Sequence, residues 1–68
     1  MKKYSLAVVT EGNPLPRICD FTVTGESVLA YEMQSALYRV WVRKGTLKRI
    51  LAEGAVLRPS DCEIFHKR

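Results

Sequence analysis

The side chains that could perform catalysis are few and widely spaced in this sequence. His66 is the one histidine and lies near the C-terminus, where chains fray, so we expect it to be poorly held for acid–base work. The carboxylates occur singly, residues 25–29 (GESVL) lack the flanking pattern of a nucleophile elbow, and no glycine-rich phosphate loop is present. The sequence therefore predicts a protein that is not an enzyme and uses no cofactor.

The two cysteines, Cys19 and Cys62, lie far apart and neither belongs to a C-x-x-C pair. With a single histidine beside them, they offer no clustered ligand set, so we expect no metal site. In a reducing compartment such residues are typically buried as free thiols, which is our expectation, with a disulfide or a reactive thiol as the alternatives.

The chemistry that remains is that of a contact surface. Residues 37–54 hold five of the eleven Lys and Arg residues and the one tryptophan. Residues 1–32 carry three bases against four acids, whereas residues 33–68 carry eight against three, an asymmetry that hints at an anionic partner. The candidate partner-binding residues are aromatic or basic: Tyr31, Tyr38, Arg39, Trp41, Arg43, Lys44, Lys48 and Arg49.

Three interpretations of these residues stay open. They could belong to a helix that is buried on two sides because the core is small. They could form a surface for a protein partner or a second copy, because Trp, Tyr and Arg are enriched at interface hot spots. The five bases could also meet phosphates while an aromatic ring stacks on an unpaired base, although no helix-turn-helix, zinc-finger or RNA-recognition signature is visible.

Length and composition limit the elements that can position this surface. Sixty-eight residues form one domain, 1–68, with a marginal core that a partner or a dimer would help to stabilise. The hydrophobic content of 47% and charged content of 26% are those of a folded chain. No apolar run approaches the roughly 20 residues that cross a bilayer, and the N-terminus lacks the features of a signal peptide, so we expect a cytoplasmic protein and no membrane partner.

The first part of the chain alternates with a period of two. Residues 4–10 and 17–24 read as strands, and residues 11–16, with two prolines, read as the loop of an antiparallel hairpin. A last strand is expected at about 56–65, or two short strands around the turn at Pro59.

Between these strands the period changes to about 3.6. Leu29, Met33, Ala36 or Leu37, and Val40 mark one side of an amphipathic helix over 26–42, with Tyr31, Tyr38 and Trp41 on the next side. A break or kink at Lys44 and Gly45 leads to a second short helix, 46–53, although RVWV-RKG-TLKRI also fits a hairpin. The fold class expected is α+β, with a sheet of about three strands packed on the helices.

In general character the chain resembles the small single-domain proteins that bacteriophages and mobile elements make to bind and block host machinery. That resemblance is of size and style and implies no specific motif. The working hypothesis is a non-catalytic protein-binding module, for example an inhibitor of a host nucleoprotein complex such as an RNA-guided defence effector or a polymerase. The alternatives are a small basic DNA- or RNA-binding regulator and a structural homodimeric accessory protein.

Overall fold

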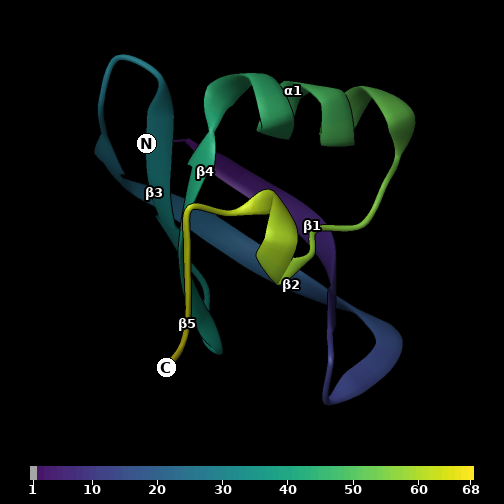
Figure 1. The fold of residues 1–68 in the computed structure, drawn as a ribbon. Coiled ribbons are helices and arrows are strands. Elements are labelled where there is room, and N and C mark those ends of the chain that lie inside the picture. The colour runs from purple at the N-terminus through teal and green to yellow at the C-terminus, as the bar shows by residue number, and fades with distance from the viewer. Residues whose placement is uncertain (1) are drawn as a thin grey trace.

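Residues 2–68 are described by the computed structural model, which contains a five-stranded antiparallel sheet and one α-helix (Figure 1). The elements are β1 (Lys3–Thr10), β2 (Asn13–Glu26), β3 (Ala30–Gln34), β4 (Tyr38–Arg43), α1 (Lys44–Glu53), a 3-10 turn η1 (Pro59–Asp61) and β5 (Ile64–Lys67). Neighbours in the chain are neighbours in the sheet, in the order β1-β2-β3-β4-β5. The expected sheet of three strands with two helices is therefore wrong. Within the described residues, no helix is long and apolar enough to span a membrane.

The expected pairing of the first two strands is confirmed. β1 and β2 run antiparallel with Leu6 opposite Cys19, and both side chains enter the core. The turn is shorter than expected, because Glu11 and Gly12 alone make it and both prolines lie in the first part of β2. Pairing with β3 begins only at Thr22, so this part of β2 has an unpaired edge, where strands tolerate proline.

The helix expected over 26–42 is instead the hairpin β3–β4. Met33 and Val40 face the core as expected, but they do so from adjacent antiparallel strands in which they are opposite one another. Residues 38–43 are rich in aromatic and β-branched side chains, which favour a strand and lose rotamer freedom in a helix. The Ser35 hydroxyl accepts hydrogen bonds from the backbone N–H groups of Leu37 (3.3 Å) and Tyr38 (3.1 Å), which fixes the turn.

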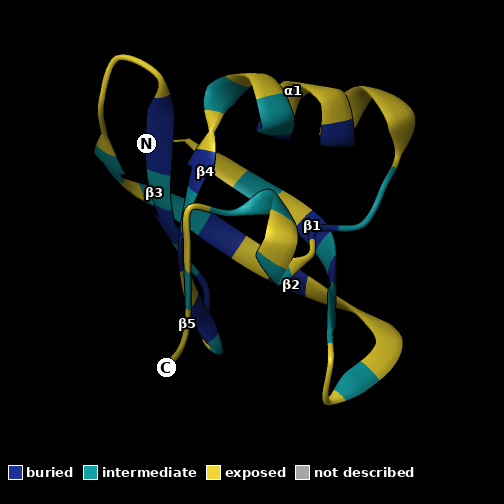
Figure 2. Ribbon diagram, in the orientation of Figure 1, coloured by how far each residue is buried: buried dark blue, intermediate teal, exposed yellow. Residues whose placement is uncertain are grey.

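The short helix expected at 46–53 is α1, which begins two residues earlier, at Lys44. Lys44 and Gly45 therefore form its first turn, and neither a kink nor a hairpin turn is present there. The helix ends at Gly54, whose φ of 63° is the left-handed conformation that glycine adopts without steric cost. Its inner side buries Leu47 and Ile50 in the core, while its outer side is exposed (Figure 2).

The segment after α1 differs from the single strand expected at 56–65. Leu57 makes an isolated parallel bridge with Val8 of β1: its N–H donates to the Ala7 carbonyl oxygen (2.8 Å) and its carbonyl oxygen accepts from the Val9 N–H (3.0 Å). The chain then passes through η1 and pairs as β5 with β4 at the other end of the sheet. This segment therefore ties the two outer strands, β1 and β5, around one core.

Candidate binding surface

Alternation along β4 decides which candidate residues reach the surface. Tyr38, Val40 and Val42 are buried, and the residues between them, Arg39, Trp41 and Arg43, lie on the outer face of the sheet. Arg39 and Arg43 are exposed and Trp41 is half-buried. Because successive side chains of a strand point to opposite faces, the three outer residues form one row, spaced two residues apart.

The two tyrosines are not part of this row. Tyr31 and Tyr38 are buried and belong to the core cluster, and the Tyr38 ring lies 4.9 Å from that of Phe65. The prediction that Tyr31, Tyr38 and Trp41 share one side of a helix was wrong, because a strand places residues 38 and 41 on opposite faces. Of the three, Trp41 is the one on the outer face of the sheet.

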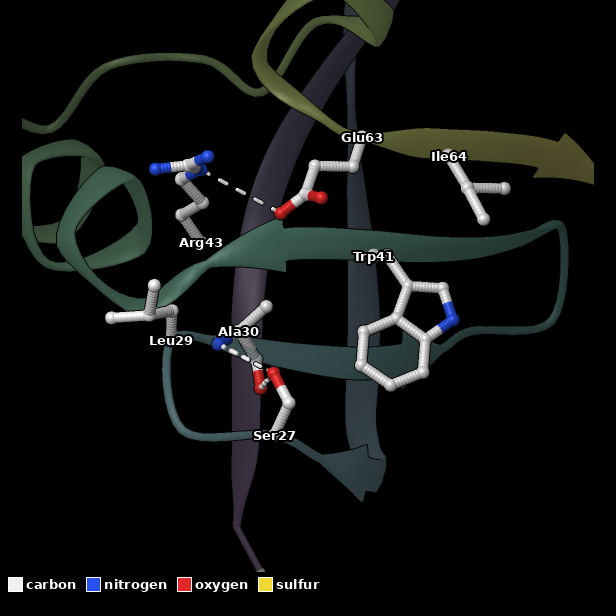
Figure 3. Close-up of a pocket in the computed structure, with 7 residues that line it drawn as sticks. All are labelled: Ser27, Leu29, Ala30, Trp41, Arg43, Glu63 and Ile64. Atoms are coloured by element: carbon white, nitrogen blue, oxygen red, sulfur yellow. Dashed lines mark hydrogen bonds and ion pairs between the residues drawn. The ribbon is translucent and has the colours of Figure 1, made fainter.

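The Trp41 ring lies across the neighbouring strands. Glu32 of β3 and Ile64 of β5 are its cross-strand partners, and the indole extends over β3 (Figure 3). At its far end is Gly25 of β2, where an added Cβ would lie 3.8 Å from the ring atom Cη2 and 3.2 Å from the Glu32 Cβ. The absence of a side chain at Gly25 therefore gives the Glu32 side chain room on this face, whereas the distance to the ring is an ordinary van der Waals contact.

An open groove of about 510 Å³ lies beside the indole. Its apolar residues are Trp41, Ile64 and Leu29, of which Leu29 is 65% exposed and Ile64 42% exposed. At one end the Arg43 Nε lies 3.7 Å from a Glu63 carboxylate oxygen (Figure 3). Ser27 and Ala30 complete the lining. We call this site the Trp41 groove: an apolar centre beside an exposed pair of opposite charges.

The basic candidates do not form one continuous surface. Arg39 and Arg43 lie on the outer face of β4, whereas Lys44, Lys48 and Arg49 belong to α1. Arg49 contacts carboxylate oxygens of Glu53 (3.4 Å) and Asp61 (3.8 Å). Arg39 lies beside His66, with its Nη2 3.4 Å from the imidazole Nδ1. Within residues 2–68, Arg39 and Lys48 are the candidate bases without a carboxylate oxygen in ion-pair range.

Lys44 belongs to a structural cluster at the start of α1. Its Nζ lies 2.5 Å from a Glu26 carboxylate oxygen and 5.0 Å from the centre of the Tyr31 ring. Lys2 donates a hydrogen bond to the Tyr31 hydroxyl oxygen (2.6 Å) and also lies 5.0 Å from the ring centre. The hydrogen bond from Lys44 and its charge lower the pKa of Glu26. These contacts join the residue before β1 to β2, β3 and α1, and account for Tyr31 and Lys44 without a partner.

The residues that could act as nucleophiles or ligands are poorly suited to both roles. Both cysteines are free, as expected, but Cys19 is buried and Cys62 only half-buried. Burial raises the pKa of the Cys62 thiol to about 12 and also raises that of Cys19, so both are protonated at neutral pH and weak as nucleophiles. In the part of the chain that the structure describes, no three His, Cys, Asp or Glu residues come together as metal ligands.

Of the seven residues that line the Trp41 groove, sequence reasoning singled out only Trp41 and Arg43. Leu29 was expected on the buried side of a helix, and Ile64 and Glu63 were not expected near Trp41. The alternation around Trp41 was a usable signal for its outward position, since valines flank it on both sides. No comparable signal exists for Leu29, because an apolar residue in a turn carries no periodicity.

Comparisons with protein-family models, with curated proteins and with solved structures found no match to this chain.

Proposed function

We propose that this chain is a non-catalytic binding protein that docks a protein partner on the outer face of β3, β4 and β5. The observation that carries the proposal is the Trp41 groove, whose lining combines a half-buried indole with two exposed aliphatic side chains, Leu29 and Ile64. Aromatic anchors in apolar depressions are the usual centres of protein interfaces. The adjacent charges, Arg43 and Glu63, suit a polar rim.

A nucleic-acid partner has less support from the same surface. Binding along a phosphate backbone requires a row of several Lys or Arg side chains that are not paired with carboxylates. Arg43 contacts Glu63, Lys44 contacts Glu26, and Arg49 contacts two acids. If Arg39 and Arg43 alone met the phosphates of a single strand, affinity would fall with log salt at a slope of only about −1.4. Trp41 fluorescence measured during titration with an oligonucleotide at two salt concentrations checks this alternative directly.

One function of such a protein would be to block a host nucleoprotein complex. In that case the groove would contact a protein component of the complex, and the charges around it would set the orientation of docking. The test below applies to that partner and to any other protein.

The test is site-specific photo-crosslinking in a lysate of the native host. The crosslinker p-benzoylphenylalanine replaces Ile64 in the groove, and in the control it replaces Leu51 of α1, which is similarly exposed (42% and 46%). We expect a defined protein product from position 64 that is absent at position 51 and is lost when Trp41→Ala is added. Identical products from both positions, or none from position 64, would contradict the proposal.

A further inference from the structure

A second groove lies beside β5, one of the two edge strands of the sheet. β5 is the last strand in the sheet order. A depression of about 730 Å³ is lined by Phe65 and Lys67 of β5, by Pro59 of η1, and by the β1–β2 turn at residues 10–13. Leu37, Tyr38 and Arg17 also line it. This β5-edge groove is larger than the Trp41 groove and shares no lining residue with it.

Two residues of β5 that line this groove direct their backbone polar groups away from β4. The Arg68 N–H donates to the Leu37 carbonyl oxygen (2.7 Å), and His66 is opposite Arg39 in the register. In an antiparallel ladder, hydrogen-bonded pairs alternate with pairs whose backbone groups point away. His66 therefore bonds to β4, whereas the N–H and C=O groups of Phe65 and Lys67 point outward and offer donors and acceptors to another strand.

The chain itself makes a strand-like contact next to this groove. Leu57, two residues before Pro59, pairs with Ala7 and Val9 on the outer edge of β1. The pairing stops after one bridge, because the chain turns into η1. The segment between α1 and β5 thus adds one strand residue to the edge of β1.

The side chains around the groove define the chemistry of its occupant. Tyr38 and Phe65 provide an aromatic wall. Arg17 and Lys67 are exposed bases on the lining, against the single acid Glu11. A second copy of the chain is disfavoured, since pairing two β5 strands would bring Lys67 and its basic neighbours of each copy together. An extended segment with an apolar residue and a nearby carboxylate matches both features.

We infer that the β5 edge binds an extended, acidic segment of a partner protein by strand addition. The backbone of the segment pairs with Phe65 and Lys67. Its alternate side chains face the groove, with an apolar residue against Tyr38 and Phe65 and a carboxylate two residues away near Arg17 and Lys67. This site is separate from the Trp41 groove, so each of the two proposals can fail without the other.

The test starts from a displayed library of random ten-residue peptides selected on the whole protein. The enriched peptides should alternate apolar and other residues and carry a carboxylate, and the amide protons of Phe65 and Lys67 should be the ones that gain protection from hydrogen exchange in the complex. Methylating the peptide nitrogens that face β5 should weaken binding about threefold to tenfold for each lost hydrogen bond. Methylating the intervening nitrogens should have little effect.

Matched variants of the protein separate backbone pairing from charge. Lys67→Pro removes an outward donor without removing a hydrogen bond to β4, and edge strands tolerate proline. It should bind the selected peptide about threefold to tenfold more weakly than Lys67→Gln, which removes only the charge. Trp41→Ala should leave the affinity within twofold. Enrichment of no peptide, equal effects of both nitrogen methylations, or loss of binding in Trp41→Ala would overturn the inference.

Discussion

Replacing Leu57 with alanine tests the closure of the fold most directly. Leu57 is 0% exposed and is the residue through which the segment after α1 contacts β1. Its two backbone hydrogen bonds survive in Leu57→Ala, so the variant measures side-chain burial alone. Leucine-to-alanine changes at fully buried sites cost about 2–5 kcal/mol. At roughly 0.05–0.15 kcal/mol per residue, the whole domain has only about 3–10 kcal/mol of stability.

The measurement is urea unfolding followed by circular dichroism. With a denaturant slope of about 1 kcal/mol per molar, a loss of about 3 kcal/mol lowers the midpoint by roughly 3 M. Leu51→Ala is the control, because the same change at an exposed position of α1 should alter the free energy of unfolding by no more than about 0.5 kcal/mol. A loss below about 1 kcal/mol in Leu57→Ala would show that this segment does not pack on β1 and would remove the basis for the positions of η1 and β5.

Three further predictions concern charge and reactivity. Because Lys44 lowers the pKa of Glu26 below its ordinary value of 4.5, the pair stabilises the fold above that pH and this contribution is lost as the pH falls through the lower, folded-state pKa. The melting temperature of Glu26→Gln should therefore change less between pH 5 and pH 3 than that of the wild type. An equal change in both proteins would contradict the ion pair. The raised pKa of Cys62 predicts that a disulfide reagent at pH 8 modifies it at least tenfold more slowly in the native protein than in urea, and equal rates would refute its burial. The double variant Arg39→Glu/Arg43→Glu should abolish crosslinking from the Trp41 groove. Because both side chains are exposed, it should change the free energy of unfolding by no more than about 1 kcal/mol. Full retention of the crosslink would exclude these two arginines from the interface.

The elements that the sequence determined are those encoded by local preferences. The β1–β2 hairpin follows from alternation on both sides of a Gly-containing turn, and its pairing was predicted correctly. The helix α1 follows from a run of strong helix formers and ends at Gly54, where no other residue reaches a positive φ so readily. The burial of Met33 and Val40 was also predictable, because both residues fall on the apolar face whether a helical or a strand period is assumed.

Tertiary structure decided the rest. Over residues 26–42 the apolar residues fit a helical period as well as a strand period, and the energy that selects the hairpin comes from β2 and β5, which flank it in the sheet. That choice moved Tyr31 and Tyr38 into the core and left Trp41 on the outer face. It also brought Leu29 and Ile64, which are 35 residues apart in sequence, into the lining of the same groove as Trp41. The composition of residues 37–54 pointed to a contact surface, but only the pairing of distant strands determined which of its side chains can reach a partner.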